Sequence, residues 1–273
     1  MQKMLKAKWL VLTLVVLFTV SIVVTGCGND ENSITEAGST TVQPIAEKLA
    51  NAFMEDNPSI DITIQGGGSS VGVKSAADGT VDIGAASREL KESEKGTVVE
   101  HVLARDGIAI VVHPDNDISG LTTEQVRNIF AGEITNWDQV GGEDGSINVV
   151  AREEGSGTRA AFEELVMEEE EKVITATAIL QPSNGAVRTT VAGDPDAIGF
   201  LSFGYLDSSV KSLSIDGVAG TVENAKNGTY PIVRPLLFLT KSEPTGIVKD
   251  FIDFCLSTEG QALVEEEGYI SVR

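Results

Sequence analysis

Three turns rich in glycine, serine and threonine constrain this sequence most, because each lies where a strand pattern changes into a helix pattern. The turns occupy residues 38–41, 66–70 and 155–158. Glycine lets the backbone adopt a positive φ or approach a ligand closely, and a serine or threonine hydroxyl can cap the following helix. The first N–H groups of each helix lack internal partners and carry the positive end of the helix dipole. Three such turns predict a site where helix N-termini converge on one small anion.

The third turn also carries an arginine. Residues 147–151 form an apolar run that predicts a buried strand, and a helical pattern begins at Ala160. Arg152 lies at the start of this turn and can offer a planar fork of donors to an oxyanion. Taken alone, the turn fits an ordinary helix cap with solvated charges equally well, since anion sites at helix N-termini are common.

Strand and helix patterns alternate along the chain, which predicts an α/β fold with largely parallel strand pairing. Residues 60–64 alternate apolar and polar side chains, whereas residues 104–112 and 232–239 form two long apolar strands. The spacing of apolar residues predicts a helical C-terminal part over residues 247–266. With 273 residues, the chain is long enough for one large domain or two smaller ones.

The charge of the chain limits the ligands that it can bind. Its formal net charge is −21, or −24 once residues 1–27 with their three lysines are removed. Such an excess of negative charge argues against broad binding to nucleic acid but is compatible with one local anion site. The two cysteines are Cys27 and Cys255, and Cys255 lies in an apolar helical pattern typical of a buried thiol. We predict no internal disulfide, no metal site and no cofactor.

The N-terminal segment has the layout of a secretory signal. Three lysines among the first eight residues precede an apolar run over residues 9–24, and small residues stand just before Cys27. This arrangement resembles the lipobox of bacterial lipoproteins, which predicts a signal peptide over residues 1–27, lipidation of Cys27 and a tether over residues 28–32. An uncleaved membrane anchor is the alternative, since the run approaches the length that spans a bilayer. Either arrangement holds the globular part at the outer face of the cytoplasmic membrane.

A serine hydrolase is a further alternative. Residues 68–72 match the GxSxG pattern of a nucleophile elbow, with Ser70 as the nucleophile. The chain offers only His101 and His113 as a general base, and the sequence places neither of them near Ser70. The pattern is weak in a stretch so rich in glycine and serine.

Taken together, these motifs resemble those of the phosphate-binding proteins of phosphate ABC transporters, the PstS family. The similarity covers nearly the whole chain after residue 27 and is carried by residues 37–41, 66–74, 81–85, 152–158 and 251–270. The resemblance implies a two-lobed periplasmic-binding-protein-like fold in which two crossing strands join the lobes and the anion lies between them. It also implies a monomeric, non-catalytic receptor that captures inorganic phosphate and delivers it to an ABC permease.

The same resemblance divides the chain into two lobes. Lobe 1 would comprise residues 33–111 and 234–273, and lobe 2 would comprise residues 112–233. The crossing strands would lie near residues 108–112 and 233–239. Because each lobe would supply half of the donors, the anion would bind the closed form better and shift the population toward closure.

The resemblance also implies a set of phosphate ligands drawn from both lobes. They are Thr40, Thr41 through its backbone N–H, Ser69, Ser87, Arg152, Ser156, Gly157 and Thr158. In relatives an acidic residue of the third turn pairs with the arginine, and Glu154 stands at that position.

Ser87 departs from the family pattern. Relatives have an aspartate at this position, which accepts the proton of hydrogen phosphate. A serine hydroxyl can accept or donate a hydrogen bond, and it lacks the charge that would repel fully ionised sulfate. A receptor for sulfate or another oxyanion therefore stays open as an alternative. The neighbouring Arg88 could either add positive charge to the site or form a structural ion pair.

Overall fold

The computed structural model describes residues 32–273, and the predicted signal peptide, Cys27 and most of the tether lie outside the described residues. The strands are β1 (Ser33–Gly38), β2 (Asp61–Gly66), β3 (Ile83–Ala86), β4 (Val99–Val112), β5 (Gly120–Leu121), β6 (Asn148–Arg152), β7 (Ile179–Gln181), β8 (Ala197–Ser202), β9 (Lys211–Ser212), β10 (Ser214–Ile215) and β11 (Val233–Thr240). The α-helices are α2 (Gln43–Asp56), α3 (Ser69–Asp78), α4 (Thr123–Ala131), α5 (Gly157–Phe162), α6 (Asn184–Ala192), α7 (Val222–Lys226), α8 (Gly246–Cys255) and α9 (Thr258–Glu266). Short 3-10 or π segments are η1 (Trp137–Val140), η2 (Glu163–Met167), η3 (Glu168–Glu170) and η4 (Phe203–Tyr205).

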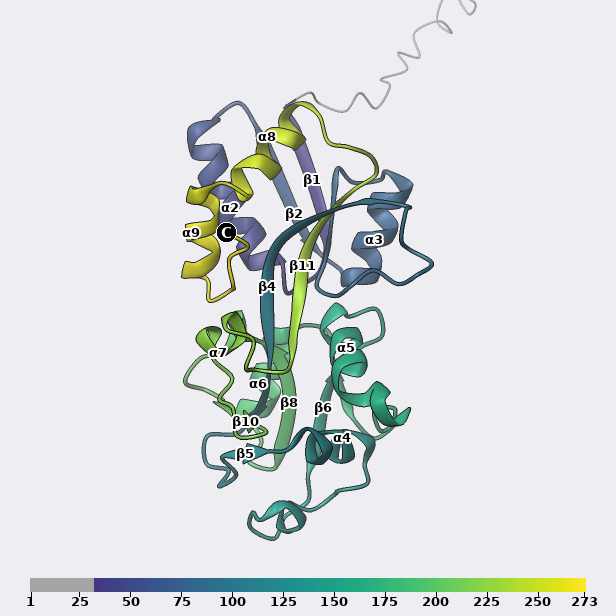
Figure 1. Ribbon diagram of the computed structural model, residues 1–273, viewed down its shortest axis with the longest axis vertical. Coiled ribbons are helices and arrows are strands. Elements are labelled where there is room, and N and C mark those ends of the chain that lie inside the picture. Colours follow the sequence, from purple (N-terminus) through teal and green to yellow (C-terminus); the bar gives the residue numbers. More distant parts are fainter. Residues whose placement is uncertain (1–31) are drawn as a thin grey trace, which may run out of the picture. The chain divides into compact units, whose positions relative to one another are not determined.

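Within residues 32–273, nine strands form one mixed sheet in the order β2-β1-β3-β11-β4-β8-β6-β7, with β9 beside β4 (Figure 1). Strand β1 pairs in parallel with β2 and β3, and β6 pairs in parallel with β7 and β8. The central strands β4 and β11 are antiparallel to each other and to β8 and β3 respectively. The expected parallel pairing thus holds only for the outer strands. The reason is that β4 and β11 carry the chain between the two halves of the sheet in opposite directions.

Strand β4 belongs to both halves of the sheet. Its N-terminal part, as far as Gly107, pairs with β11, and its last five residues, from Ile108, pair with β8. Below, lobe 1 denotes β1–β3 and β11 with α2, α3, α8 and α9, and lobe 2 denotes β5–β10 with α4–α7. The long strands β4 and β11 run side by side between the two lobes (Figure 1).

Each lobe has its own hydrophobic core. In lobe 1, helices α2, α8 and α9 cover one face of the sheet, where Phe53 meets Phe251 edge-on with ring centroids 5.4 Å apart. Helix α3 covers the opposite face. In lobe 2, the rings of Phe162 and Phe200 stack at 4.2 Å. Trp137 is buried in the same core.

Two element limits differ from the sequence pattern. Strand β4 begins at Val99 rather than at residue 104, because its first four side chains alternate between half-buried and exposed instead of forming an apolar run. The helical C-terminal part is two helices, since Ser257 starts α9 by accepting the Gly260 N–H on its Oγ at 3.1 Å. Every helix within residues 32–273 is too short or too polar to cross a lipid bilayer.

Candidate anion-binding site

The three glycine-rich turns meet at the interface between the lobes. The Ser70 N–H of lobe 1 donates to the Gly155 carbonyl of lobe 2 at 3.2 Å. A Cβ atom added to Gly157 would lie 2.1 Å from the Ser69 Oγ and 2.5 Å from the Ser87 Oγ. Only glycine at position 157 therefore lets the third turn approach the hydroxyls of lobe 1 this closely.

Glycine also shapes the turns of lobe 1. Gly38 has a φ of 146°, and a Cβ atom added there would lie 2.2 Å from the Ala85 carbonyl oxygen. Gly68 has a φ of 91°, and its N–H donates to the Gly38 carbonyl at 2.8 Å. These two positions allow the turns that carry Ser39 and Ser69 to pack against the end of β3.

Three serine hydroxyls form a buried cluster where β3 ends. The Ser39 Oγ donates to the Ser87 Oγ at 2.8 Å, and the Ser87 N–H donates to the Ser69 Oγ at 3.0 Å. The Oγ atoms of Ser69 and Ser87 are 3.3 Å apart. The structure thus brings the predicted residues Ser69 and Ser87 together, and it adds Ser39, which is not among the predicted ligands.

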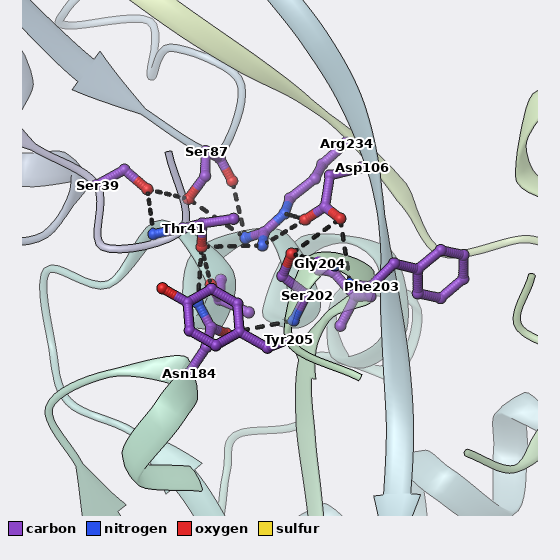
Figure 2. Close-up of polar contacts among 12 residues, drawn as sticks. Ser39, Thr41, Ser87, Asp106, Asn184, Ser202, Phe203, Gly204, Tyr205 and Arg234 are labelled. Carbon is purple, nitrogen blue, oxygen red and sulfur yellow. Dashed lines mark hydrogen bonds and ion pairs between the residues drawn. The ribbon is translucent and has the colours of Figure 1, made fainter. Parts of the chain in front are cut away.

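Two threonine hydroxyls meet across the interface. The Oγ1 atoms of Thr41 and Thr158 are 3.1 Å apart, and the Asn184 Nδ2 of α6 donates to the same Thr41 oxygen at 2.8 Å (Figure 2). The resemblance implies that Thr41 offers its backbone N–H to the ligand. In the structure this N–H donates to the Ser39 Oγ at 3.2 Å, and the Thr41 hydroxyl reaches lobe 2 instead.

Thr40 of lobe 1 is held by two residues of lobe 2. Its Oγ1 accepts from the Arg152 Nη2 at 3.3 Å, and its carbonyl accepts from the Tyr205 hydroxyl of lobe 2 at 2.7 Å. The next carbonyl, that of Thr41, accepts from the Tyr269 hydroxyl of lobe 1 at 2.9 Å. Burial raises the pKa of Tyr205 to about 12, so this hydroxyl remains a neutral donor at physiological pH.

Arg152 is almost fully buried and pairs with the residue that follows it. Its Nε and Nη2 atoms donate to the Glu153 carboxylate at 3.0 and 2.9 Å. The expected pairing with Glu154 is therefore wrong. The Glu153 N–H still bonds the Gln181 carbonyl of β7, so Glu153 stays beside the end of β6 and Glu154 falls in the turn.

Ser156 caps a helix and also lines a pocket. Its Oγ caps α5 by accepting the Arg159 N–H at 3.2 Å. The same residue lines a pocket of about 320 Å³ together with Arg88 and Glu154. The Arg88 guanidinium donates to both oxygens of the Glu94 carboxylate, at 2.7 and 2.8 Å, which makes it a structural ion pair.

A second buried arginine contacts the hydroxyl cluster. Arg234 of β11 lies opposite Asp106 of β4, and its Nε and Nη2 atoms donate to the Asp106 Oδ2 at 3.1 and 2.8 Å. Burial raises the pKa of Asp106, while the charge of Arg234 acts in the opposite direction. Arg234 also donates to the Ser87 carbonyl at 3.0 Å and to the Thr41 Oγ1 at 3.2 Å. Neither residue is among those predicted from the sequence, although each is a charge inside a long apolar run.

The chain's two histidines are engaged elsewhere than at Ser70. The His101 Nε2 bonds the Thr240 Oγ1 at 2.9 Å, and the His113 Nδ1 accepts the Asp115 N–H at 3.1 Å. Ser70 therefore receives no base from either histidine. In the described part of the chain, no group of three or more His, Cys, Asp or Glu side chains is arranged to hold a metal ion.

The two lobes, the two linking strands and the donors between them define a binding protein of the periplasmic type. Residues 25–259 match the family model described as a PBP superfamily domain. The chain is 38% identical over 245 residues to the phosphate-binding protein PstS of Bacillus subtilis, which covers 88% of this chain and 81% of that relative. It is 32% identical over 260 residues to PstS of Borreliella burgdorferi, which covers 90% and 93% of the two chains. The chain therefore belongs to the PstS family of phosphate-binding proteins.

Solved structures show the same likeness. A phosphate ABC transporter substrate-binding protein from Clostridium perfringens, crystallised with bound phosphate, has a TM-score of 0.85 and 44% sequence identity. That comparison covers 89% of this chain and 100% of the other. An ABC-type phosphate transport receptor from Vibrio cholerae has a TM-score of 0.74 and 40% identity, and it covers 87% of this chain and 99% of that one.

Proposed function

We propose that this protein captures inorganic phosphate between its two lobes and delivers it to an ABC importer. The observation that carries this proposal is the convergence of donors from both lobes. Ser69 and Ser87 face Gly157, and Thr41 contacts Thr158. The PstS relatives and the phosphate-bound receptor of Clostridium perfringens support phosphate as the anion. Membership of the PstS family makes this chain a binding protein rather than an enzyme.

The proposed site keeps the eight residues that the resemblance implies, whether each meets the anion directly or through a neighbouring hydroxyl. They are Thr40, Thr41, Ser69, Ser87, Arg152, Ser156, Gly157 and Thr158. Arg152 and Arg234 each already have their own carboxylate, so the site holds an anion by oriented N–H and O–H dipoles rather than by net charge. Donors fixed in place replace the water shell of the anion, and an anion that leaves a buried donor unpaired binds less well.

Closure of the lobes follows from this division of donors. Because the anion touches both lobes only in the closed form, binding shifts the population toward closure. We keep residues 33–111 with 234–273 and residues 112–233 as the proposed limits of the two moving bodies. The closed form is then the one that the permease receives.

PstS proteins are extracytoplasmic, and the described residues of this chain form the part that meets the ligand. We propose that lipidation of Cys27 anchors this part to the outer face of the cytoplasmic membrane and that it works as a monomer. Mass spectrometry of the native protein tests this arrangement, because cleavage before Cys27 and an acyl modification on it change the mass of the N-terminal peptide.

Calorimetric titration of ligand-stripped protein with inorganic phosphate tests the proposed function. We expect a Kd of about 10⁻⁶ M or below, and a flat titration would refute the proposal. Arg152→Ala should raise this Kd about 100-fold, because a charged donor is lost from a buried site. Arg127→Gln is the matched control, since Arg127 is also buried and paired with glutamates but contacts none of the proposed ligands. Competition with sulfate in the same titration measures selectivity between the two anions.

A further inference from the structure

Asp106 fixes Arg234 and has both of its oxygens occupied. Its Oδ2 accepts the two hydrogen bonds from Arg234, and its Oδ1 accepts from the Ser202 Oγ at 3.0 Å and from the Phe203 N–H at 3.2 Å (Figure 2). Ser202 and Phe203 belong to lobe 2, whereas Arg234 belongs to β11. Asp106 therefore serves Arg234 as a counterion and leaves the remaining donors of that guanidinium to other groups.

Besides the Ser87 carbonyl, those remaining donors reach two hydroxyl oxygens of the site. The Arg234 Nη2 lies 3.2 Å from the Thr41 Oγ1, and the Nη1 lies 3.4 Å from the Ser87 Oγ. A guanidinium can only donate, so both hydroxyl oxygens act as acceptors toward Arg234. Each hydroxyl has one hydrogen and two lone pairs, and counting them fixes the direction of the neighbouring hydrogen bonds.

The threonine chain runs from Thr41 to Thr158. The Thr41 Oγ1 accepts from Arg234 and from the Asn184 Nδ2. The Asn184 amide is held in this orientation because its Oδ1 accepts the Ser202 N–H at 3.3 Å. With both lone pairs of Thr41 used, its hydrogen points to the Thr158 Oγ1, 3.1 Å away. The hydroxyl hydrogen of Thr158 is then available to a ligand.

The serine chain runs from Ser39 through Ser87 to Ser69. The Ser39 Oγ accepts the Thr41 N–H and donates to the Ser87 Oγ, which also accepts from Arg234. The hydrogen of Ser87 is therefore directed to the Ser69 Oγ, which accepts the Ser87 N–H as well. The hydroxyl hydrogen of Ser69 is left for a ligand. Ser87 itself acts as a relay and has no lone pair for the proton of hydrogen phosphate.

We propose that Arg234, fixed by Asp106, is a positioning residue that turns the hydroxyl hydrogens of Ser69 and Thr158 toward the bound oxyanion. This inference rests on the proposed function and deepens it. Arg234 determines the polarity of both hydroxyl chains, so that each chain presents a donor to the anion. A site of this polarity suits fully charged oxygen atoms, and it lacks the acceptor that an aspartate at position 87 would supply.

A double-mutant cycle tests the inference by calorimetry with inorganic phosphate on ligand-stripped protein. The pair variant Asp106→Asn/Arg234→Gln removes the guanidinium without leaving a buried carboxylate unpaired, and Thr158→Val removes one terminal donor. We expect each to raise the Kd about 10-fold or more. Both changes act through the hydroxyl hydrogen of Thr158. The variant that combines them should therefore have about the same Kd as whichever of the two separate variants binds phosphate more weakly. A combined Kd that equals the product of the two separate fold-changes would overturn the inference.

Thermal unfolding without phosphate separates positioning from a structural role. Arg127→Gln, the buried-arginine control, should lower the Tm and leave the Kd unchanged, whereas the pair variant should change the Kd beyond any effect on Tm. If the pair variant does not fold, Arg234→Lys takes its place, because it keeps a charge beside Asp106 but cannot reach both hydroxyls. Binding by Arg234→Lys with the wild-type Kd would then refute the inference.

The same titrations distinguish this inference from the proposed function. If the wild-type protein does not bind phosphate, the proposed function fails and this inference fails with it. If the wild-type protein binds phosphate and the pair variant binds it equally well, the proposed function stands and only the role of Arg234 is refuted.

Discussion

Replacing Glu36 by glutamine tests how a buried carboxyl in lobe 1 ties the stability of the fold to pH. Glu36 lies in β1, is only 1% exposed, and pairs with Ile64 of β2 and Ile83 of β3. Neither of its carboxylate oxygens has a hydrogen-bond partner among residues 32–273. Burial, with a smaller contribution from Glu47, raises the pKa of Glu36 from its usual 4.5 to about 8.

The folded chain therefore keeps a proton on Glu36 at pH values where the unfolded chain has lost it. The stability that this bound proton contributes is fully present below pH 4.5 and falls as the pH rises toward about 8. Above that pH the contribution is lost and no longer changes. Each unit of difference between the folded and unfolded pKa values corresponds to about 1.4 kcal/mol, so the whole loss is about 5 kcal/mol. Domains of this kind are typically stable by only about 5–15 kcal/mol.

Urea unfolding of the ligand-free wild-type protein and of Glu36→Gln, in buffers from about pH 5 to about pH 9, measures this loss. The glutamine amide cannot ionise. As the pH rises over this range, the free energy of unfolding of the wild type should therefore fall by about 4 kcal/mol relative to that of the variant. Glu55→Gln, an exposed change on α2, is the control and should run parallel to the wild type. Parallel curves for Glu36→Gln as well would refute the reasoning.

Three further outcomes are expected. Gly157→Ala should raise the calorimetric Kd for phosphate about 100-fold and shift the ligand-free Tm by only a few degrees, because the added Cβ meets the Ser69 and Ser87 hydroxyls; wild-type affinity would contradict the close approach. Tyr205→Phe removes a hydroxyl that joins the lobes, so stopped-flow measurements should show phosphate leaving several-fold faster, and an unchanged dissociation rate would argue against that bond as a closure contact. Raising NaCl from about 0.05 M to about 0.5 M should change the Kd less than about 3-fold, because each buried arginine of the site already has a carboxylate, and a steep loss would mean that net charge drives binding.

Much of the fold follows from local patterns. A strand buried on both faces is an uninterrupted apolar run, which is why the inner part of β4 and most of β11 can be predicted. The antiparallel pairing of these strands cannot be predicted in this way. It depends on how more than a hundred intervening residues bring the chain back from the end of β4 to the start of β11. The half-exposed start of β4 is missed for a related reason, since an alternating stretch with charges does not continue an apolar run.

The site is predictable where its chemistry is local. Glycine and hydroxyl residues at a helix start cap the helix or bind an anion through groups that are close in sequence. The turns with Ser69 and Ser156 could therefore be predicted as parts of the site. Asp106 and Arg234 lie 128 residues apart in the sequence, and they form an ion pair beside the site only because β4 and β11 are paired. The choice between Glu153 and Glu154 as partner of Arg152 likewise depends on which residue continues the pairing of β6 with β7, which no residue count decides.

The interleaving of the lobes along the chain has a consequence for how the protein forms after synthesis. Lobe 2 is built from one continuous stretch, whereas lobe 1 needs β11, α8 and α9 from the far end of the sequence. Closing so long a loop slows the assembly of lobe 1. We expect the middle of the chain to fold first and the N-terminal strands to wait, with unpaired edges, until the last helices arrive.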